Sequence, residues 1–78
     1  MATQIADKIN AAFADQNWGT LVAKAWTKKT EHGTLERVYI NRTNGKSAGF
    51  VAIKESGFEL VSIDGAVLKS VLKTALGM

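Results

Sequence analysis

Few side chains in this sequence are suited to covalent or metal chemistry. His32 is the only histidine among the 78 residues, and cysteine is absent. A Cys/His zinc site and a disulfide framework are therefore both excluded. A general base needs a positioned partner in a shaped pocket, but His32 stands in the turn-like segment at residues 30–33. We expect no catalytic residue, no cofactor and no metal site, and hence a protein that is not an enzyme.

Positive charge is concentrated in the middle of the chain. The formal net charge is +3, from 10 Lys and Arg against 7 Asp and Glu. Residues 24–54 hold seven basic and two acidic side chains, a net +5, whereas the segments before and after them each come to −1. This distribution favours an anionic partner for the middle of the chain.

Three aromatic residues, Trp26, Tyr39 and Phe50, occur within the same basic stretch. Bases of single-stranded nucleic acid stack on aromatic rings, and nearby lysines and arginines neutralise the phosphates. The combination predicts nucleic-acid binding, provided that the fold brings both kinds of side chain to one surface.

Hydrophobic residues at helical spacing predict a helix near the start of the chain. Ile5, Ile9 and Phe13 recur at intervals of four residues and define one face of a helix over residues 3–17. Thr3 is a suitable N-cap, because its hydroxyl can accept a hydrogen bond from a first-turn N–H group.

A second helix is predicted near the end of the chain. Leu68 and Leu72 lie on one helical face, and Asp64 is the expected N-cap. Gly77 suits the left-handed residue that ends this helix, and Gly19 is expected to do the same for the first helix.

Four stretches between the helices are rich in β-branched and aromatic residues or alternate in polarity, and no proline interrupts them. They predict strands over residues 21–29, 34–42, 47–54 and 58–63. The sequence thus predicts one α+β domain over residues 1–78 with the order α-β-β-β-β-α. A single four-stranded antiparallel sheet would carry both helices on one face.

Turn lengths set the expected register of the first three strands. Asn44-Gly45 is a strong signal for a two-residue hairpin, which places Tyr39 opposite Phe50 and Thr43 opposite Lys46.

A four-residue turn at 30–33 places Trp26 opposite Arg37. The sequence does not decide which side chains of the fourth strand point to the apolar face, because Phe58, Leu60 and Val61 cannot all point to one face.

These registers divide the sheet residues between two faces. The apolar face, expected to lie under the helices, carries Leu21, Ala23, Ala25, Val38, Ile40, Val51 and Ile53. The other, which we call the open face, is expected to provide the binding residues Lys24, Trp26, Lys28, Arg37, Tyr39, Phe50 and Lys54. Ala48 and Ala52 flank Phe50 and make this second face less polar than is usual for a fully solvated sheet face.

The sequence leaves two functions open for the open face. In the first, the rings stack on bases and the cations contact phosphates of single-stranded or non-specific nucleic acid. In the second, the face binds protein, because exposed aromatic residues and arginine are typical of interfaces. That partner would be a second copy in a homodimer, or a host protein bound or inhibited by an accessory protein of a phage or mobile element.

The chain shows no targeting or membrane segment. Its first residues lack a basic segment followed by an apolar core, and no apolar run approaches the roughly 20 residues that span a bilayer. We expect a cytoplasmic protein without a membrane partner.

Overall fold

Four consecutive strands form one antiparallel sheet in which neighbours in the chain are also neighbours in space. In the computed structural model, which describes residues 1–78, the strands are β1 (Leu21–Thr30), β2 (Gly33–Arg42), β3 (Ser47–Lys54) and β4 (Gly57–Val61). Helix α1 (Ala2–Asp15) precedes the sheet and helix α2 (Ala66–Leu76) follows it. The predicted order α-β-β-β-β-α and the single antiparallel sheet are confirmed.

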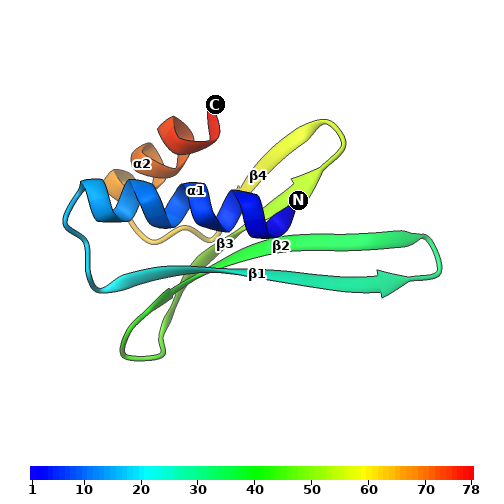
Figure 1. Ribbon diagram of the computed structural model, residues 1–78, viewed down its shortest axis with the longest axis horizontal. Helices are drawn as coiled ribbons and strands as arrows, with labels where there is room; N and C mark the ends of the chain where they lie inside the picture. The colour runs from blue at the N-terminus through cyan, green and yellow to red at the C-terminus, as the bar shows by residue number, and fades with distance from the viewer.

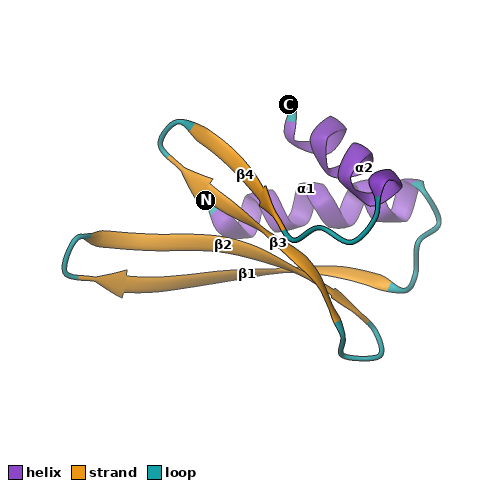
Figure 2. Ribbon diagram, turned by 180° about the vertical axis from the view of Figure 1, so that it is seen from behind, coloured by secondary structure: helices purple, strands orange, loops and turns teal.

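The sheet is strongly twisted, so the β1–β2 and β3–β4 hairpins point in different directions (Figure 2). The β1–β2 hairpin is the longer, and its turn extends past α1 (Figure 1). Helix α1 packs against β1 and β2, and α2 packs against α1. Neither helix has the length and apolar character needed to cross a bilayer.

Both helices and one face of the sheet contribute to a single apolar cluster. Ile9 of α1, Leu72 of α2 and Val38 of β2 are each 0% exposed, as are Ile40 and Val51. No polar or charged residue is buried with them. The cohesion of the fold therefore comes from the burial of aliphatic and aromatic side chains.

The expected caps of α1 are both wrong. Thr3 lies inside the helix, which begins at Ala2. The N–H of Ala2 donates to Oε1 of Glu36 on β2 at 3.2 Å, so a carboxylate from the sheet satisfies a first-turn donor. After the helix, Asn17 rather than Gly19 takes a left-handed φ, of 58°.

The half-buried Trp18 closes one end of the apolar cluster. Its ring centroid lies 6.1 Å from that of Phe13, and it packs against the buried residues of the core. Trp18 therefore belongs to the core and not to the open face.

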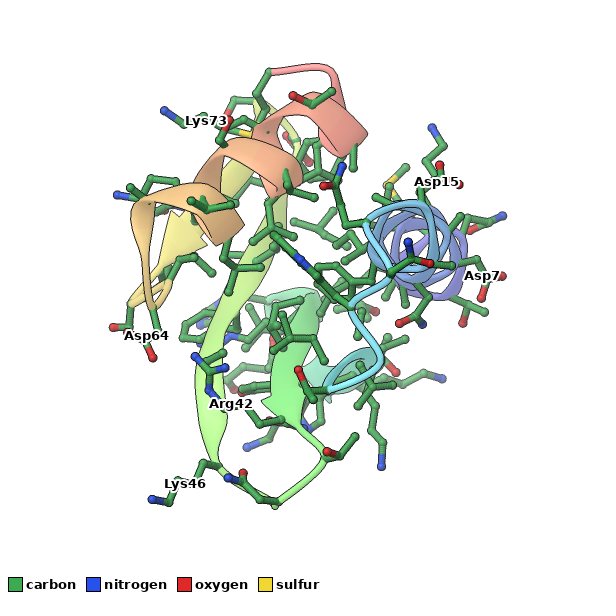
Figure 3. All side chains as sticks on the ribbon, turned by 90° about the vertical axis from the view of Figure 1, so that its left-hand side faces the viewer. Asp7, Asp15, Arg42, Lys46, Asp64 and Lys73 are labelled. Atoms are coloured by element: carbon green, nitrogen blue, oxygen red, sulfur yellow. The ribbon has the colours of Figure 1, made fainter.

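Asp64 does not cap α2, contrary to the sequence prediction. The residue before this helix is Gly65, and no side chain accepts from the first-turn N–H groups. Arg42 Nη2 instead donates to Asp64 Oδ2 at 2.9 Å, and Figure 3 shows the two side chains directed toward each other. This pair connects β2 to the segment before α2. Gly77 ends α2 with a left-handed φ of 72°, as predicted.

The β2–β3 turn is longer than predicted. A two-residue type I′ turn needs positive φ at both central residues, but of the two only Gly45 has one, at 88°. Asn41 pairs with Ser47. The predicted pairing of Thr43 with Lys46 is therefore wrong.

A β-bulge at Ala48 and Gly49 restores the register beyond this turn, so Tyr39 pairs with Phe50 as predicted. Gly49 has a φ of 111°, and a Cβ there would lie 2.6 Å from the carbonyl oxygen of Ser62. The bulge turns Ala48 into the core, where it is 1% exposed. The prediction that Ala48 flanks Phe50 on the open face is therefore wrong.

The pairing of β3 with β4 shows which side chains of the fourth strand face the helices. Leu60 pairs with Val51, and Phe58 pairs with Ile53, so Leu60 and Phe58 lie on the face that the helices cover. Val61, at an alternate position, lies on the open face.

The helices cover less of β1 than predicted. Ala23 is 4% exposed, but Ala25 is an exposed residue. The outer part of the β1–β2 hairpin, near its turn, runs beyond α1 (Figure 1).

Candidate functional site

The residues predicted to bind a ligand all lie on the open face. Trp26 pairs with Arg37, and Lys24 pairs with Tyr39. Tyr39 in turn pairs with Phe50. Residues paired across antiparallel strands share a face, and so do alternate residues along a strand. The remaining two residues, Lys28 and Lys54, join this face by that alternation.

Three aromatic rings form a contiguous group across β1, β2 and β3. The ring centroids of Trp26 and Tyr39 are 5.9 Å apart at an interplanar angle of 89°, an edge-to-face contact. Those of Tyr39 and Phe50 are 5.4 Å apart at 41°. All three side chains are half-buried. Because each ring rests beside the next, the group keeps its shape without a covering helix.

Arg37 contacts all three aromatic residues. Its guanidinium carbon lies 4.7 Å from the ring centroid of Phe50 and 5.5 Å from that of Trp26. Its Nη1 donates to the hydroxyl of Tyr39 at 3.1 Å. A guanidinium has five N–H donors, so further donors stay available to a ligand. We call Trp26, Arg37, Tyr39 and Phe50 the aromatic cluster.

The lysines of the open face differ in their surroundings. Lys24 and Lys28 are exposed on either side of Trp26 along β1, and neither takes part in an ion pair. Four residues of extended strand place their Cα atoms about 13 Å apart. Lys54, by contrast, forms an ion pair with Glu59. The unpaired lysines of this face therefore lie on β1, beside the Arg37 guanidinium of β2, which also has no acidic partner.

Strand β4 adds residues to the open face that the sequence reasoning missed. Glu59 pairs with Ala52, and Val61 pairs with Phe50, so both point to this side. The pairing of Lys54 with Gly57 leaves a two-residue turn between them. A two-residue turn at Glu55-Ser56 was therefore the signal that could have fixed the register of β4.

The remaining chemistry-bearing residues do not gather into a second site. His32 lies in the β1–β2 turn with its side chain 89% exposed, and its Nε2 is 3.6 Å from Oε1 of Glu31. No group of His, Cys, Asp and Glu side chains is arranged to hold a metal ion.

Three hollows of the surface lie away from the open face. They are lined by residues of the helices, of the segments at their ends and of the strand ends at Leu21 and Arg42, and none includes a residue of the open face. A flat face with rings and cations suits an extended ligand or a second surface better than an enclosed small molecule.

The geometry of this face is the only guide to its ligand. Comparison of the chain with protein-family models, with curated proteins and with solved structures finds no match.

Proposed function

We propose that this protein is a non-enzymatic, cytoplasmic protein that binds single-stranded or non-specific nucleic acid through the open face. One observation carries the proposal: three aromatic rings contact one another on an uncovered sheet face, beside two lysines without acidic partners. The absence of cysteine from so small a domain favours an intracellular location.

The aromatic cluster would provide the stacking surface. Trp26, Tyr39 and Phe50 are held at fixed angles by their mutual contacts and by Arg37. A preorganised surface loses little conformational freedom when bases stack on it. Each stacked base contributes roughly 1–3 kcal/mol, with little dependence on its identity.

Lys24 and Lys28 would contact phosphates. Each phosphate contact releases condensed counterions, so the logarithm of the binding constant falls with the logarithm of the salt concentration, by about 0.7 per contact for a single strand. Glu59 makes the β4 side of the face less positive, because it pairs with Lys54. We therefore expect the backbone of the strand to run along the β1 side.

The decisive experiment measures the fluorescence anisotropy of a labelled single-stranded oligonucleotide titrated with the protein at several salt concentrations. In the double variant Lys24→Gln, Lys28→Gln, we expect weaker binding and a salt slope smaller by about 1.4. The matched control is Lys69→Gln, Lys73→Gln, which removes two exposed lysines at the same spacing from α2. The control should leave the slope unchanged.

A separate variant tests the contribution of base stacking to the affinity. Trp26→Leu keeps an apolar residue on β1 but removes the ring, and we expect affinity to fall roughly 5- to 150-fold at constant salt slope. No binding by the wild-type protein at low salt would reject the proposal, and so would equal losses in the two lysine double variants.

A protein partner is the second candidate, favoured by the apolar residues around the aromatic cluster. Leu35, also on this face, is 46% exposed, and Val22 and Val61 lie at its margins. If this face joins two copies of the chain, Phe50→Ala should lower the mass of the protein in solution. This outcome, without oligonucleotide binding, would favour the second candidate over the first.

A further inference from the structure

Strand β1 is an edge strand, and α1 closes only one point of that edge. The N–H of Ala23 donates to Oδ1 of Asn10 at 2.8 Å, and Nδ2 of Asn10 donates to the carbonyl oxygen of Ala23 at 3.0 Å. The polar backbone groups of Ala23 thus point away from β2, and the amide of Asn10 takes the place of a neighbouring strand.

The same direction recurs at every second residue of an antiparallel strand. Ala25, Thr27 and Lys29 therefore also direct their N–H and C=O groups outward. All three residues are exposed, and no hydrogen bond beyond those of the sheet reaches these groups. Such a row of unpaired groups is a template for another strand.

We propose that this edge pairs with the same edge of a second copy of the chain, antiparallel and centred on Thr27. The free stretch is bounded by Asn10 at Ala23 and by the turn that begins at Glu31. Thr27 is its midpoint. An antiparallel pair centred there uses the whole free stretch of both copies and leaves the bond between Asn10 and Ala23 intact.

The side chains favour this register. With Thr27 opposite the partner's Thr27, Lys29 lies opposite the partner's Ala25, and Lys28 lies opposite the partner's Trp26. These two lysines then face an alanine and a tryptophan, and a lysine across from tryptophan gains a cation–π contact. A register displaced by two residues would instead place Lys24 opposite the partner's Lys28, which like-charge repulsion disfavours.

The pairing would join two sheets into one and bring two aromatic clusters onto a continuous open face. The benefit for nucleic-acid binding rests on the proposed function, but the pairing itself does not. Sedimentation equilibrium tests the pairing without any ligand, whereas oligonucleotide titration tests the function, so the two can fail separately.

The expected sedimentation mass is twice the 8.4 kDa of the chain, with a concentration-dependent return to the monomer. Thr27→Pro removes an N–H group that the β1–β2 ladder does not use, so the variant should fold and remain monomeric. Circular dichroism checks the folding. Amide exchange should be slow at Ala25, Thr27 and Lys29 in the dimer. In the variant, where residue 27 has no amide hydrogen, exchange should be fast at Ala25 and Lys29.

A charge exchange tests the register. Ala25→Lys opposes the partner's Lys29 at two symmetric places and should weaken the dimer by about tenfold. Adding Lys29→Glu to the same chain should restore the affinity between the two copies. Ala14→Lys, at an exposed position of α1, is the matched control. A wild-type protein that is monomeric up to about 1 mM, or a dimer that survives Thr27→Pro, would overturn the proposal.

Discussion

The two faces of the same sheet are both rich in apolar residues, but they are stabilised in different ways. On the helix side, Val38, Ile40 and Val51 are 0% exposed and pack under α1 and α2. On the open face, Trp26 and Tyr39 remain half-buried and pack sideways against each other. The residues of the first group thus pack under a covering layer, whereas the rings of the open face reach across strands to their neighbours.

The helix-covered face contributes mainly to the stability of the fold, whereas the open face provides a binding surface. Burial under the helices removes apolar area from water and provides most of the cohesion. Sideways contacts among rings contribute less, since part of each ring still meets water, but they hold the rings in fixed positions. The comparison therefore predicts large losses of stability on one face and large losses of binding on the other.

The largest effect on stability is expected at the helix side. Phe13 is 2% exposed, and Phe13→Ala should cost about 3–5 kcal/mol in the free energy of unfolding. In a domain this small, such a loss leaves much of the protein unfolded at room temperature. Urea denaturation followed by circular dichroism measures it. A loss no larger than that of Phe50→Ala would contradict the division between the faces.

Gly49→Ala should come next, because the bulge keeps Phe50 on the open face and Ala48 in the core. The variant combines a strained positive φ with a contact of 2.6 Å between the new Cβ and the carbonyl oxygen of Ser62. We expect a loss of about 3 kcal/mol. Gly33→Ala is the matched control, since Gly33 has a φ of 124° but open space around the added Cβ. Equal losses would show that the close approach to Ser62 is unimportant.

Phe50→Ala should cost only about 1–2 kcal/mol in stability, because the ring is half-buried. The variant also removes the ring beneath Arg37 and the neighbour of Tyr39. We therefore expect the affinity for a single-stranded oligonucleotide to fall at least roughly fivefold. A stability loss without any change in affinity would assign the ring a structural role only.

Glu59→Gln should have the smallest effect on folding. Its ion pair with Lys54 joins side chains that are 51% and 55% exposed, so we expect a change of less than about 0.5 kcal/mol. The affinity for an oligonucleotide should rise about two- to threefold, because Lys54 is released to contact a phosphate. Glu31→Gln, at the far turn, is the control. An unchanged affinity would exclude Lys54 from the binding surface.

Much of the fold could be predicted because it depends on local patterns. Every strand begins within one residue of its predicted start, because alternation and glycine-containing turns are visible in the sequence. The pairing of Trp26 with Arg37 followed from the turn at residues 30–33. The pairing of Tyr39 with Phe50 was predicted from a two-residue turn that does not form, and it holds because the β-bulge compensates for the longer turn. The predicted binding residues consequently share one face.

The errors arose where distant residues compete with local signals. Asp64 is a good N-cap by type, but Arg42, 22 residues away in the chain, takes its carboxylate. The bulge places Gly49 against the backbone of Ser62, a contact that no local pattern reveals. Ala25 has the small side chain of a helix contact, but it is exposed on the edge strand β1, and no local pattern reveals how much of an edge strand a helix covers.

The bond between Asn10 and Ala23 also bears on the order in which the chain folds. It joins residues 13 apart, whereas the contact between Ala2 and Glu36 joins residues 34 apart. Closing the longer loop costs roughly 0.9 kcal/mol more in chain entropy. The second half of α1 can therefore dock on β1 as soon as that strand is extended, and the first turn of the helix docks after β2 has arrived. The amide of Asn10 occupies the outward N–H and C=O groups of Ala23, so at this residue further strands can be added only on the β2 side of β1.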